Sequence, residues 1–212
     1  MPRNHQEPVI GGLVLAAGGS TRFGSPKQLL SCGEQNFVQR AVQTGIDSGV
    51  TPLVVVLGAG APFVRPEVTQ FPVQMIINRD WQEGVGSSIR LGLRALLQLA
   101  PTMRALVITT CDQPKVSAQH MEELVDVYLN QGKPIVSSCY EQDLRADAFG
   151  LPTLFDQSNF EALENLRDDE DPRNIIRERL PEAAFLYCPD GSFDIDTPAD
   201  YDRYMAEMGA PA

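Results

Sequence analysis

Residues 13–30 read Leu13-Val-Leu-Ala-Ala-Gly-Gly-Ser-Thr-Arg-Phe-Gly-Ser-Pro-Lys-Gln-Leu-Leu30. An aliphatic run leads directly into two alanines and two glycines, which predicts a buried strand followed by a tight turn. Small residues at such a turn let backbone N–H groups approach an anion closely. The segment lacks the Gly-Lys-Ser/Thr of a Walker A loop and the third glycine of a dinucleotide-binding fingerprint. By itself it is compatible with a phosphate-binding loop and with an ordinary strand-to-helix turn.

The rest of the chain repeats this pattern of a short aliphatic run followed by a segment of helical period. The alternation is typical of an α/β protein with a mostly parallel central sheet covered by helices on both faces. The predicted strands are residues 9–15, 52–57, 73–77, 105–109 and 134–138, and the predicted helices are residues 37–48, 87–100 and 118–130. After residue 138 the sequence predicts a strand or loop pair at residues 140–155, short helices at 159–166 and 172–179, a strand at 193–195 and a helix beginning at Thr197-Pro198.

Length and composition predict one domain spanning residues 1–212, with a polar leader at residues 1–8. The formal net charge is -11 and no basic cluster is visible, which argues against binding to duplex nucleic acid or to an anionic membrane surface. No apolar run approaches the ~20 residues of a membrane span, and the leader has no signal-peptide core, so we expect a cytoplasmic protein. The four cysteines form no CxxC pair, which predicts free buried thiols and argues against a zinc site.

Two cations, Arg22 and Lys27, follow the glycines in the same loop. Transfer of a nucleotidyl group places negative charge on the leaving pyrophosphate and on the oxygens of the α-phosphorus. Arginine offers a planar fork to pyrophosphate, whereas lysine offers a point charge suited to the α-phosphoryl oxygens. The alternative is that both are solvated surface cations.

Carboxylates that suit a magnesium ion occur at two later positions. Asp112 follows the aliphatic run 105–109, which places it at the carboxyl end of a strand, where open α/β sheets bind ligands. Asp194 and Asp196 flank Ile195, so on an extended segment both carboxylates point to one side and the isoleucine to the other. Mg²⁺ takes one or two carboxylates and completes its shell with waters and substrate phosphates. Either aspartate pair could instead cap a helix or turn.

Three further features complete the set of candidates. The segment Glu83-Gly-Val-Gly-Ser-Ser-Ile-Arg90 opens a predicted helix, where Ser88 could contact a base or ribose or could belong to a simple capped helix start. The acidic run at residues 168–171 predicts a solvated loop. His5 in the leader and His120 in a predicted surface helix are not expected to act in catalysis, because neither adjoins a motif residue.

Residues 15–30 closely resemble the motif LAAGxSxRFGxxKLL of the molybdenum cofactor cytidylyltransferases, the MocA-like branch of the MobA-like nucleotidyltransferase superfamily. Later segments resemble that family's later motifs, in the same order and at similar spacing, so the resemblance covers nearly the whole chain. These segments are Gly84-Val-Gly-Ser-Ser-Ile-Arg-Leu-Gly-Leu93, Cys111-Asp-Gln-Pro114, Phe149-Gly-Leu-Pro152 with Phe155, and Phe193-Asp-Ile-Asp-Thr-Pro-Ala-Asp-Tyr201.

The resemblance implies a Rossmann-like three-layer sandwich that couples a nucleoside triphosphate to a molybdopterin-type phosphomonoester with release of pyrophosphate. It implies a nucleotide loop at Leu15, Ala16, Ala17, Gly18 and Gly19, phosphate cations at Arg22 and Lys27, a base or ribose contact at Ser88, and Mg²⁺ ligands at Asp112 with Asp194 or Asp196. The family contrast between LAAG, as here, and LAGG in guanylyl-transferring relatives favours CTP over GTP. The resemblance also implies a client molybdoenzyme that receives the matured cofactor.

One segment departs from the family pattern. Residues 167–174 read Arg-Asp-Asp-Glu-Asp-Pro-Arg-Asn, where the cytidylyltransferases usually carry a Gly-Asp-Lys-Gly-Ala-Arg-like segment on the acceptor side, and Arg173 is the residue that matches the arginine. A transferase acting on GTP and molybdopterin or on a sugar phosphate is therefore an alternative. A non-catalytic nucleotide-binding chaperone for a molybdoenzyme is another, although the presence of Lys27 and Asp112 argues against it.

Overall fold

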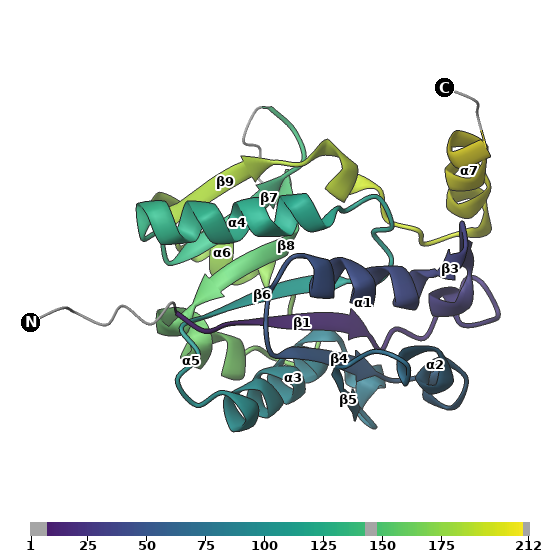
Figure 1. Ribbon diagram of the computed structural model, residues 1–212, viewed down its shortest axis with the longest axis horizontal. Helices are drawn as coiled ribbons and strands as arrows, with labels where there is room; N and C mark the ends of the chain where they lie inside the picture. The colour runs from purple at the N-terminus through teal and green to yellow at the C-terminus, as the bar shows by residue number, and fades with distance from the viewer. Residues whose placement is uncertain (1–7, 143–147, 210–212) are drawn as a thin grey trace, which may run out of the picture.

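The computed structural model describes residues 8–142 and 148–209, so most of the expected leader, including His5, lies outside the described residues. At its centre is a seven-stranded sheet in the order β5-β4-β1-β6-β8-β7-β9 (Figure 1). These strands are β1 (Ile10–Ala16), β4 (Leu53–Leu57), β5 (Gln74–Ile77), β6 (Ala105–Thr110), β7 (Ile135–Cys139), β8 (Phe149–Asp156) and β9 (Ala183–Tyr187). Among them β8 runs antiparallel to both neighbours, and the other adjacent pairs are parallel. The predicted mostly parallel α/β sheet is confirmed.

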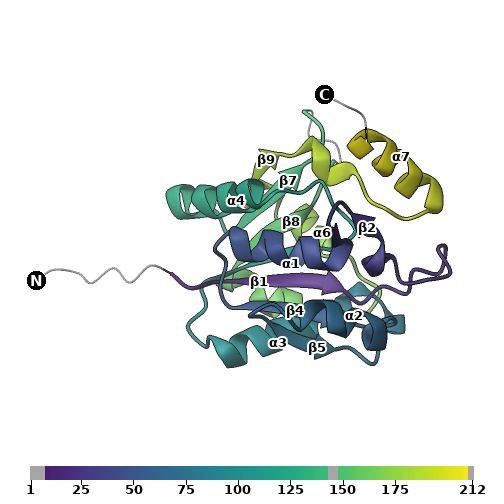
Figure 2. The same cartoon turned by 45° about the vertical axis from the view of Figure 1, so that its right-hand side comes forward.

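Helices cover both faces of this sheet. They are α1 (Phe37–Asp47), α2 (Ala61–Val68), α3 (Val85–Leu99), α4 (Ala118–Gln131), α5 (Phe160–Glu164), α6 (Arg173–Glu178) and α7 (Pro198–Gly209). Because side chains alternate along a strand, Val14 of β1 joins the apolar core under α1, α2 and α4. Its neighbours Leu13 and Leu15 join the core under α3, α5 and α6. The two cores make a helix–sheet–helix sandwich, in which α1 and α4 lie next to each other over one face (Figures 1 and 2).

Two elements of the sandwich were not predicted. Helix α2 contains Pro62 and Pro66, which hide its helical pattern, although a proline in the first turn loses no intrahelical hydrogen bond. Strand β9 pairs in parallel with β7, yet all its side chains are partly or fully exposed, so it lacks the aliphatic run of a central strand. A two-stranded hairpin, β2 (Ser31–Cys32) with β3 (Gln35–Asn36), is also too short to give a sequence pattern.

The predicted strand at residues 193–195 is wrong. The structure describes this segment as irregular backbone, which meets the sheet through one hydrogen bond from the Ile195 N–H to the Asp112 carbonyl at 2.9 Å. Ile195 itself is fully buried, and this burial accounts for the strand-like alternation of the sequence. The region predicted as a strand or loop pair contains β8, which enters the sheet between β6 and β7.

Helix α7 stands beside the sandwich and not over a face of the sheet (Figure 2). It is held by a small separate core that joins Ile195 and Tyr204 to Cys32 and Phe37. The Tyr204 ring meets Phe37 edge-on at a centroid distance of 5.8 Å, and its hydroxyl lies 2.8 Å from the Cys32 sulfur. This core fixes the segment before α7 against the loop that follows β1.

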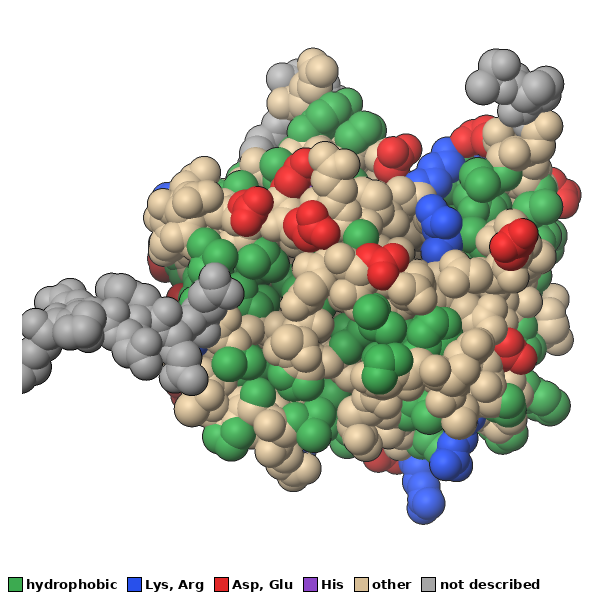
Figure 3. Space-filling model, in the orientation of Figure 1, with side chains coloured by type: hydrophobic (Ala, Val, Ile, Leu, Met, Phe, Trp, Pro, Cys, Tyr) green, Lys and Arg blue, Asp and Glu red, His purple; other side chains and the backbone are tan. Residues whose placement is uncertain are grey.

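The cysteines, the helices and the surface charges bear on the expectations drawn from composition. The four cysteines are free and buried, as predicted. Within the described residues, no helix has the length and apolar character needed to cross a membrane. On the face shown in Figure 3, acidic, apolar and uncharged side chains intermingle over the region of α1 and α4, and the basic side chains form no broad patch there.

Candidate active site

A cleft of about 570 Å³ opens at the carboxyl-terminal edge of β1 and β6. Every residue that the sequence nominated for the site lines it: Leu15, Ala16, Ala17, Gly18, Gly19, Arg22, Lys27, Ser88, Asp112, Asp194 and Asp196. On one side, which we call the glycine-loop half, lie residues 15–28 and 81–88. On the other, the β8 half, lie Tyr140, Gly150, Leu151 and residues 171–173. Asp112 follows β6, which separates β1 from β8 in the sheet, so it stands between the halves.

The loop after β1 is held in shape by Gln28. This side chain is 1% exposed, and its Nε2 donates to the carbonyls of Ala16 at 3.1 Å and Gly18 at 2.9 Å. Ser20, which has a positive φ of 49°, accepts a hydrogen bond from the Lys27 N–H at 2.9 Å. These bonds fold residues 16–27 into a closed loop whose carbonyls are engaged on the inner side, which leaves its glycines beside the cleft.

The two glycines of the loop have different surroundings. A Cβ built on Gly18 would meet no described atom within 4 Å, so this position faces open space. A Cβ on Gly19 would lie 2.6 Å from the Trp81 ring, which therefore packs directly on the glycine backbone. Trp81 also lines the cleft. The second glycine is thus required by the aromatic ring, and the first leaves room for a ligand.

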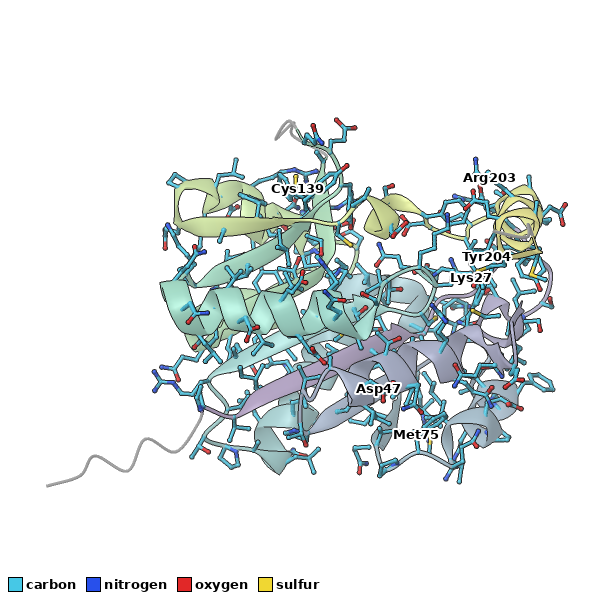
Figure 4. All side chains as sticks on the ribbon, turned by 45° about the horizontal axis from the view of Figure 1, so that its top comes forward. Lys27, Asp47, Met75, Cys139, Arg203 and Tyr204 are labelled. Carbon is cyan, nitrogen blue, oxygen red and sulfur yellow. The ribbon has the colours of Figure 1, made fainter. Side chains whose placement is uncertain are left out.

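Lys27 lies at the junction of the two halves. Its Nζ donates to Asp112 Oδ2 at 2.7 Å, to Asp196 Oδ1 at 2.9 Å and to the Ile195 carbonyl at 3.0 Å, so all its donors are engaged. Burial acts to lower the Lys27 pKa, but the two carboxylates outweigh it and raise the pKa above its ordinary value. Lys27 and Tyr204 lie at the end of the molecule that carries α7 (Figure 4). Arg22 is more exposed and pairs with Asp196 at 3.4 Å.

The three aspartates form an acidic cluster around this lysine. Asp194 and Asp196 both line the cleft while Ile195 is buried, which is the alternation expected from the sequence. Burial and the negative charge of Asp112 raise the pKa of Asp194 to about 6. Within residues 8–142 and 148–209, no three acidic, thiol or imidazole groups form a ready-made metal cage. The carboxylates suit a cation that draws its remaining ligands from water and phosphate, as Mg²⁺ does.

The start of α3 places two serines beside the glycine-loop half. Asn78 Nδ2 donates to Ser87 Oγ at 2.8 Å and to Ser88 Oγ at 2.9 Å. The Ser87 hydroxyl donates to the Gly84 carbonyl at 2.7 Å, as in a helix start. Ser88, which the sequence nominated, is the serine of the pair that lines the cleft.

The segment 168–171 is a loop, as predicted, and 45% of the Asp168 side chain is exposed, but this residue also has partners on α3. Asp168 accepts the Gly86 N–H on its backbone carbonyl at 2.9 Å, and its carboxylate pairs with Arg90, whose guanidinium also binds the Leu166 carbonyl. A Cβ at Gly86 would collide with the Arg167 carbonyl. The acidic run therefore closes over the first turn of α3, and it joins α3 to the β8 half.

Two more side chains complete the β8 half. Arg173, the residue that matched the arginine of the family segment, lines the cleft and donates from Nε and Nη2 to Asp171 Oδ2 at 2.9 and 2.7 Å. Tyr140 lines it too, and burial raises the pKa of its hydroxyl.

His120 was expected on a surface helix, but it is 7% exposed and its Nε2 lies 2.7 Å from Ser138 Oγ. It is not among the described residues that line the cleft, so its predicted absence from the site residues agrees with its position.

Residues 12–183 match the model of the MobA-like NTP transferase domain, which is most of the chain. The protein belongs to the MobA-like NTP transferase family. Its relatives carry different names. It is 30% identical to nicotine blue oxidoreductase of Paenarthrobacter nicotinovorans over 90% of this chain and 93% of the relative. It is 28% identical to the purine catabolism protein PucB of Bacillus subtilis over 96% and 99% of the two chains.

Other relatives of this MobA-like protein match in part or in structure. A probable molybdenum cofactor guanylyltransferase of Bacillus mycoides is 28% identical over 59% of this chain and 60% of its own length. The crystal structure of Rv0371c from Mycobacterium tuberculosis H37Rv, 26% identical, superposes with a TM-score of 0.80 over 94% and 99% of the two chains. A manganese complex of Rv0371c superposes with a TM-score of 0.75 at 25% identity over 93% and 98%. These structures agree with the sheet and helix arrangement of this protein.

Sequence reasoning missed several residues of this MobA-like cleft. Gln28 was not nominated, because a single polar residue between Lys27 and Leu29 gives no periodic pattern. Trp81 and Tyr140 stand in segments with no regular period. Both are aromatic residues that come shortly after a predicted strand, which is the signal that could have nominated them.

Proposed function

We propose that this protein is a magnesium-dependent cytidylyltransferase that transfers CMP from CTP to the phosphate of a molybdopterin-type cofactor and releases pyrophosphate. The observation that carries the proposal is the meeting of the glycine loop, Lys27 and Asp112 in one cleft. Membership of the MobA-like NTP transferase family supports the reaction type. The presence of Ala17 in the loop, as in LAAG families, supports CTP, and the relative named as a molybdenum cofactor guanylyltransferase supports the acceptor.

In the proposed reaction an oxygen of the acceptor phosphate forms a bond to the α-phosphorus of CTP. The bond from that phosphorus to the oxygen bridging to the β-phosphate breaks, and pyrophosphate leaves with the electron pair. Arg22 and Lys27 supply positive charge where the leaving group and the α-phosphoryl oxygens become more negative. The acceptor phosphate is already ionised at neutral pH, so the protein needs no general base and contributes mainly by positioning.

The carboxylates of the cleft have a separate role in this proposal. Asp112, with Asp194 or Asp196, would hold Mg²⁺, which supplies charge neutralisation on the phosphates when bound. A relative whose crystal structure contains manganese supports a divalent cation. Lys27 pairs with both Asp112 and Asp196 and so offsets part of the negative charge of this acidic group.

Pyrophosphate release tests the proposal directly. The purified protein is incubated with magnesium, molybdenum cofactor and, separately, CTP, GTP or ATP, and the nucleotidylated product is identified by mass. We expect CMP transfer with CTP and its loss in Asp112→Asn. Transfer from GTP would overturn the assignment of CTP as the nucleotide. Pyrophosphate release only in the presence of sugar phosphates would overturn the assignment of molybdopterin as the acceptor. The absence of turnover with every nucleotide would overturn the enzymatic function.

A further inference from the structure

Strands β7 and β8 pair irregularly at the wall of the cleft. Ser137 lies opposite Thr153, but the next residue, Ser138, lies opposite Gly150, so two residues of β8 stand outside the pairing. These are Leu151 and Pro152, which follow Gly150 directly. Gly150 and Leu151 line the cleft. The wall of the β8 half is therefore a bulge, and a bulge leaves backbone carbonyls without ladder partners.

Each backbone carbonyl of residues 150–152 accepts a hydrogen bond from a buried or half-buried hydroxyl. The Gly150 carbonyl accepts from Thr153 Oγ1 at 2.7 Å, the Leu151 carbonyl from Tyr140 at 2.6 Å, and the Pro152 carbonyl from Ser138 Oγ at 2.6 Å. Ser138 and Thr153 have no exposed surface. Hydroxyl groups thus satisfy these carbonyls, the Gly150 carbonyl accepting also from Ser137 Oγ at 3.1 Å, which gives the bulge a single defined shape.

The hydrogen bonds continue away from the wall on both sides. The Ser138 hydroxyl donates its hydrogen bond to the Pro152 carbonyl, so it accepts the hydrogen bond that it shares with His120. The Nε2 atom of His120 therefore carries a hydrogen. On the cleft side, Gln113 Nε2 donates to the Tyr140 hydroxyl at 3.4 Å and to the Gly191 carbonyl at 2.7 Å. Gln113 follows Asp112 in the chain. The bulge is thus connected from α4 to the residue beside the acidic cluster.

Glycine at position 150 is part of the same arrangement. A Cβ there would lie 2.6 Å from the Tyr140 hydroxyl and 3.4 Å from Arg173 Cδ. The wall consequently brings Tyr140 against the backbone without an intervening side chain. A side chain at position 150 would therefore push Tyr140 away from the wall of the cleft.

We propose that Tyr140, Ser138 and His120 are positioning residues that hold the Gly150–Leu151 wall and thereby set the affinity for the acceptor molecule. The inference rests on the proposed nucleotidyl transfer, in which the triphosphate occupies the glycine-loop half. The sheet order places β6 and Asp112 between that loop and β8, so a phosphorylated acceptor that meets the α-phosphorus from the far side contacts the bulge. The hydroxyls act through the wall and do not touch the reacting atoms.

The test uses Ser138→Ala, Tyr140→Phe and His120→Ala, with His120→Gln as the conservative variant that keeps a donor. Transfer is measured with the acceptor varied at saturating nucleotide, and then with the nucleotide varied. We expect the KM for the acceptor to rise about tenfold, as for the loss of one buried hydrogen bond, while the KM for the nucleotide is unchanged. His120→Gln restores the wild-type KM.

The matched control is Ser48→Ala, because Ser48 is also buried and donates to one carbonyl, that of Gly45 in α1, at 2.9 Å. It should leave both KM values unchanged. Equal rises in both KM values, or a loss of thermal stability with unchanged kinetics, would overturn the inference and leave the proposed function standing. A wild-type protein that transfers no nucleotide to any acceptor would overturn both.

Discussion

The two halves of the cleft are built in different ways. In the glycine-loop half, the bonds that shape the loop lie within one continuous segment, residues 16–28, such as those from Gln28 to Ala16 and Gly18. In the β8 half, the wall depends on β7, β8 and α4, and His120 reaches Ser138 from a neighbouring element. A motif confined to one segment is visible in a sequence, whereas a wall shared by three elements is not. Lys27 and Gly19 belong to the loop but also contact other segments, since Lys27 joins Asp112 and Asp196 and Gly19 packs against Trp81.

The largest effect is expected where the halves meet. Lys27→Ala should reduce the rate of pyrophosphate release roughly 10²–10³-fold, the range typical of losing one preorganised charge stabiliser. The variant also leaves Asp112 and Asp196 without their shared cation, so the KM values for nucleotide and acceptor should both rise. Steady-state kinetics check this. Arg65→Ala, which removes an exposed cation on α2, is the control and should change neither value. Unchanged pyrophosphate release by Lys27→Ala would contradict this role of Lys27, whereas full biological function without pyrophosphate release would favour a non-catalytic chaperone.

A second change separates the acidic segment from α3. Gly86→Ala places a methyl group against the Arg167 carbonyl, which is backbone and cannot move aside by a rotamer change. We expect the free energy of unfolding to fall by about 1–3 kcal/mol, as in overpacked sites. Urea denaturation measures the loss. Gly209→Ala, whose Cβ meets no described atom within 4 Å, should have the unfolding midpoint of the wild type. If the two variants were equally stable, residues 167–168 would not be fixed on α3.

The two loop glycines test how the glycine-loop half is organised. Gly19→Ala should displace the Trp81 ring and weaken nucleotide binding by about tenfold, or roughly 1.4 kcal/mol. Gly18→Ala should leave the ring in place, because that position faces open space. The chain has one tryptophan, so its fluorescence reports this ring alone. A shifted emission maximum in Gly18→Ala and none in Gly19→Ala, before nucleotide is added, would contradict the contact.

The smallest effect concerns the β8 half and depends on pH. Burial lowers the pKa of His120 below its ordinary value of 6.5, and the charge of Glu123 opposes this in part. The unfolded chain therefore binds the proton more readily, so the stability from neutral His120 is present above pH 6.5 and is lost as the pH falls below it. We expect the stability gap between wild type and His120→Gln to narrow between pH 7.5 and pH 5.5, by at most about 1.4 kcal/mol per unit of pKa shift. Parallel unfolding curves at both pH values would show that His120 is not buried in its neutral form.

Much of the glycine-loop half could be predicted from the sequence. The strand-turn pattern of residues 13–19 located the loop, and the spacing of Asp194 and Asp196 placed both carboxylates in the cleft with Ile195 buried. The expected strand at residues 193–195 was nevertheless wrong, because burial of one isoleucine by Phe37 and Tyr204 produces the same alternation as a strand.

The other departures from expectation share one feature, a partner on another element. Charged residues are usually solvated, so the acidic run was expected to be free, but Arg90 and the Gly86 N–H give Asp168 partners from α3. His120 was placed on a surface because α4 shows no pattern at that position, but Ser138 of β7 satisfies its ring nitrogen inside the protein. For His120 this partner offsets the cost of desolvation, whereas Asp168 keeps 45% of its side chain exposed.

The sequence by itself determined the mostly parallel sheet, the glycine loop and the residue types that gather at the strand ends, because these depend on local pattern and on the alternation of side chains along strands. Only the tertiary structure decided that Lys27 bridges Asp112 and Asp196, and that Trp81 packs on Gly19. It also decided that hydroxyl groups satisfy the carbonyls of Gly150 and Leu151. The Lys27 and Trp81 contacts join segments that are distant in the chain, and the energies of all these contacts depend on burial that exists only after the segments have packed together.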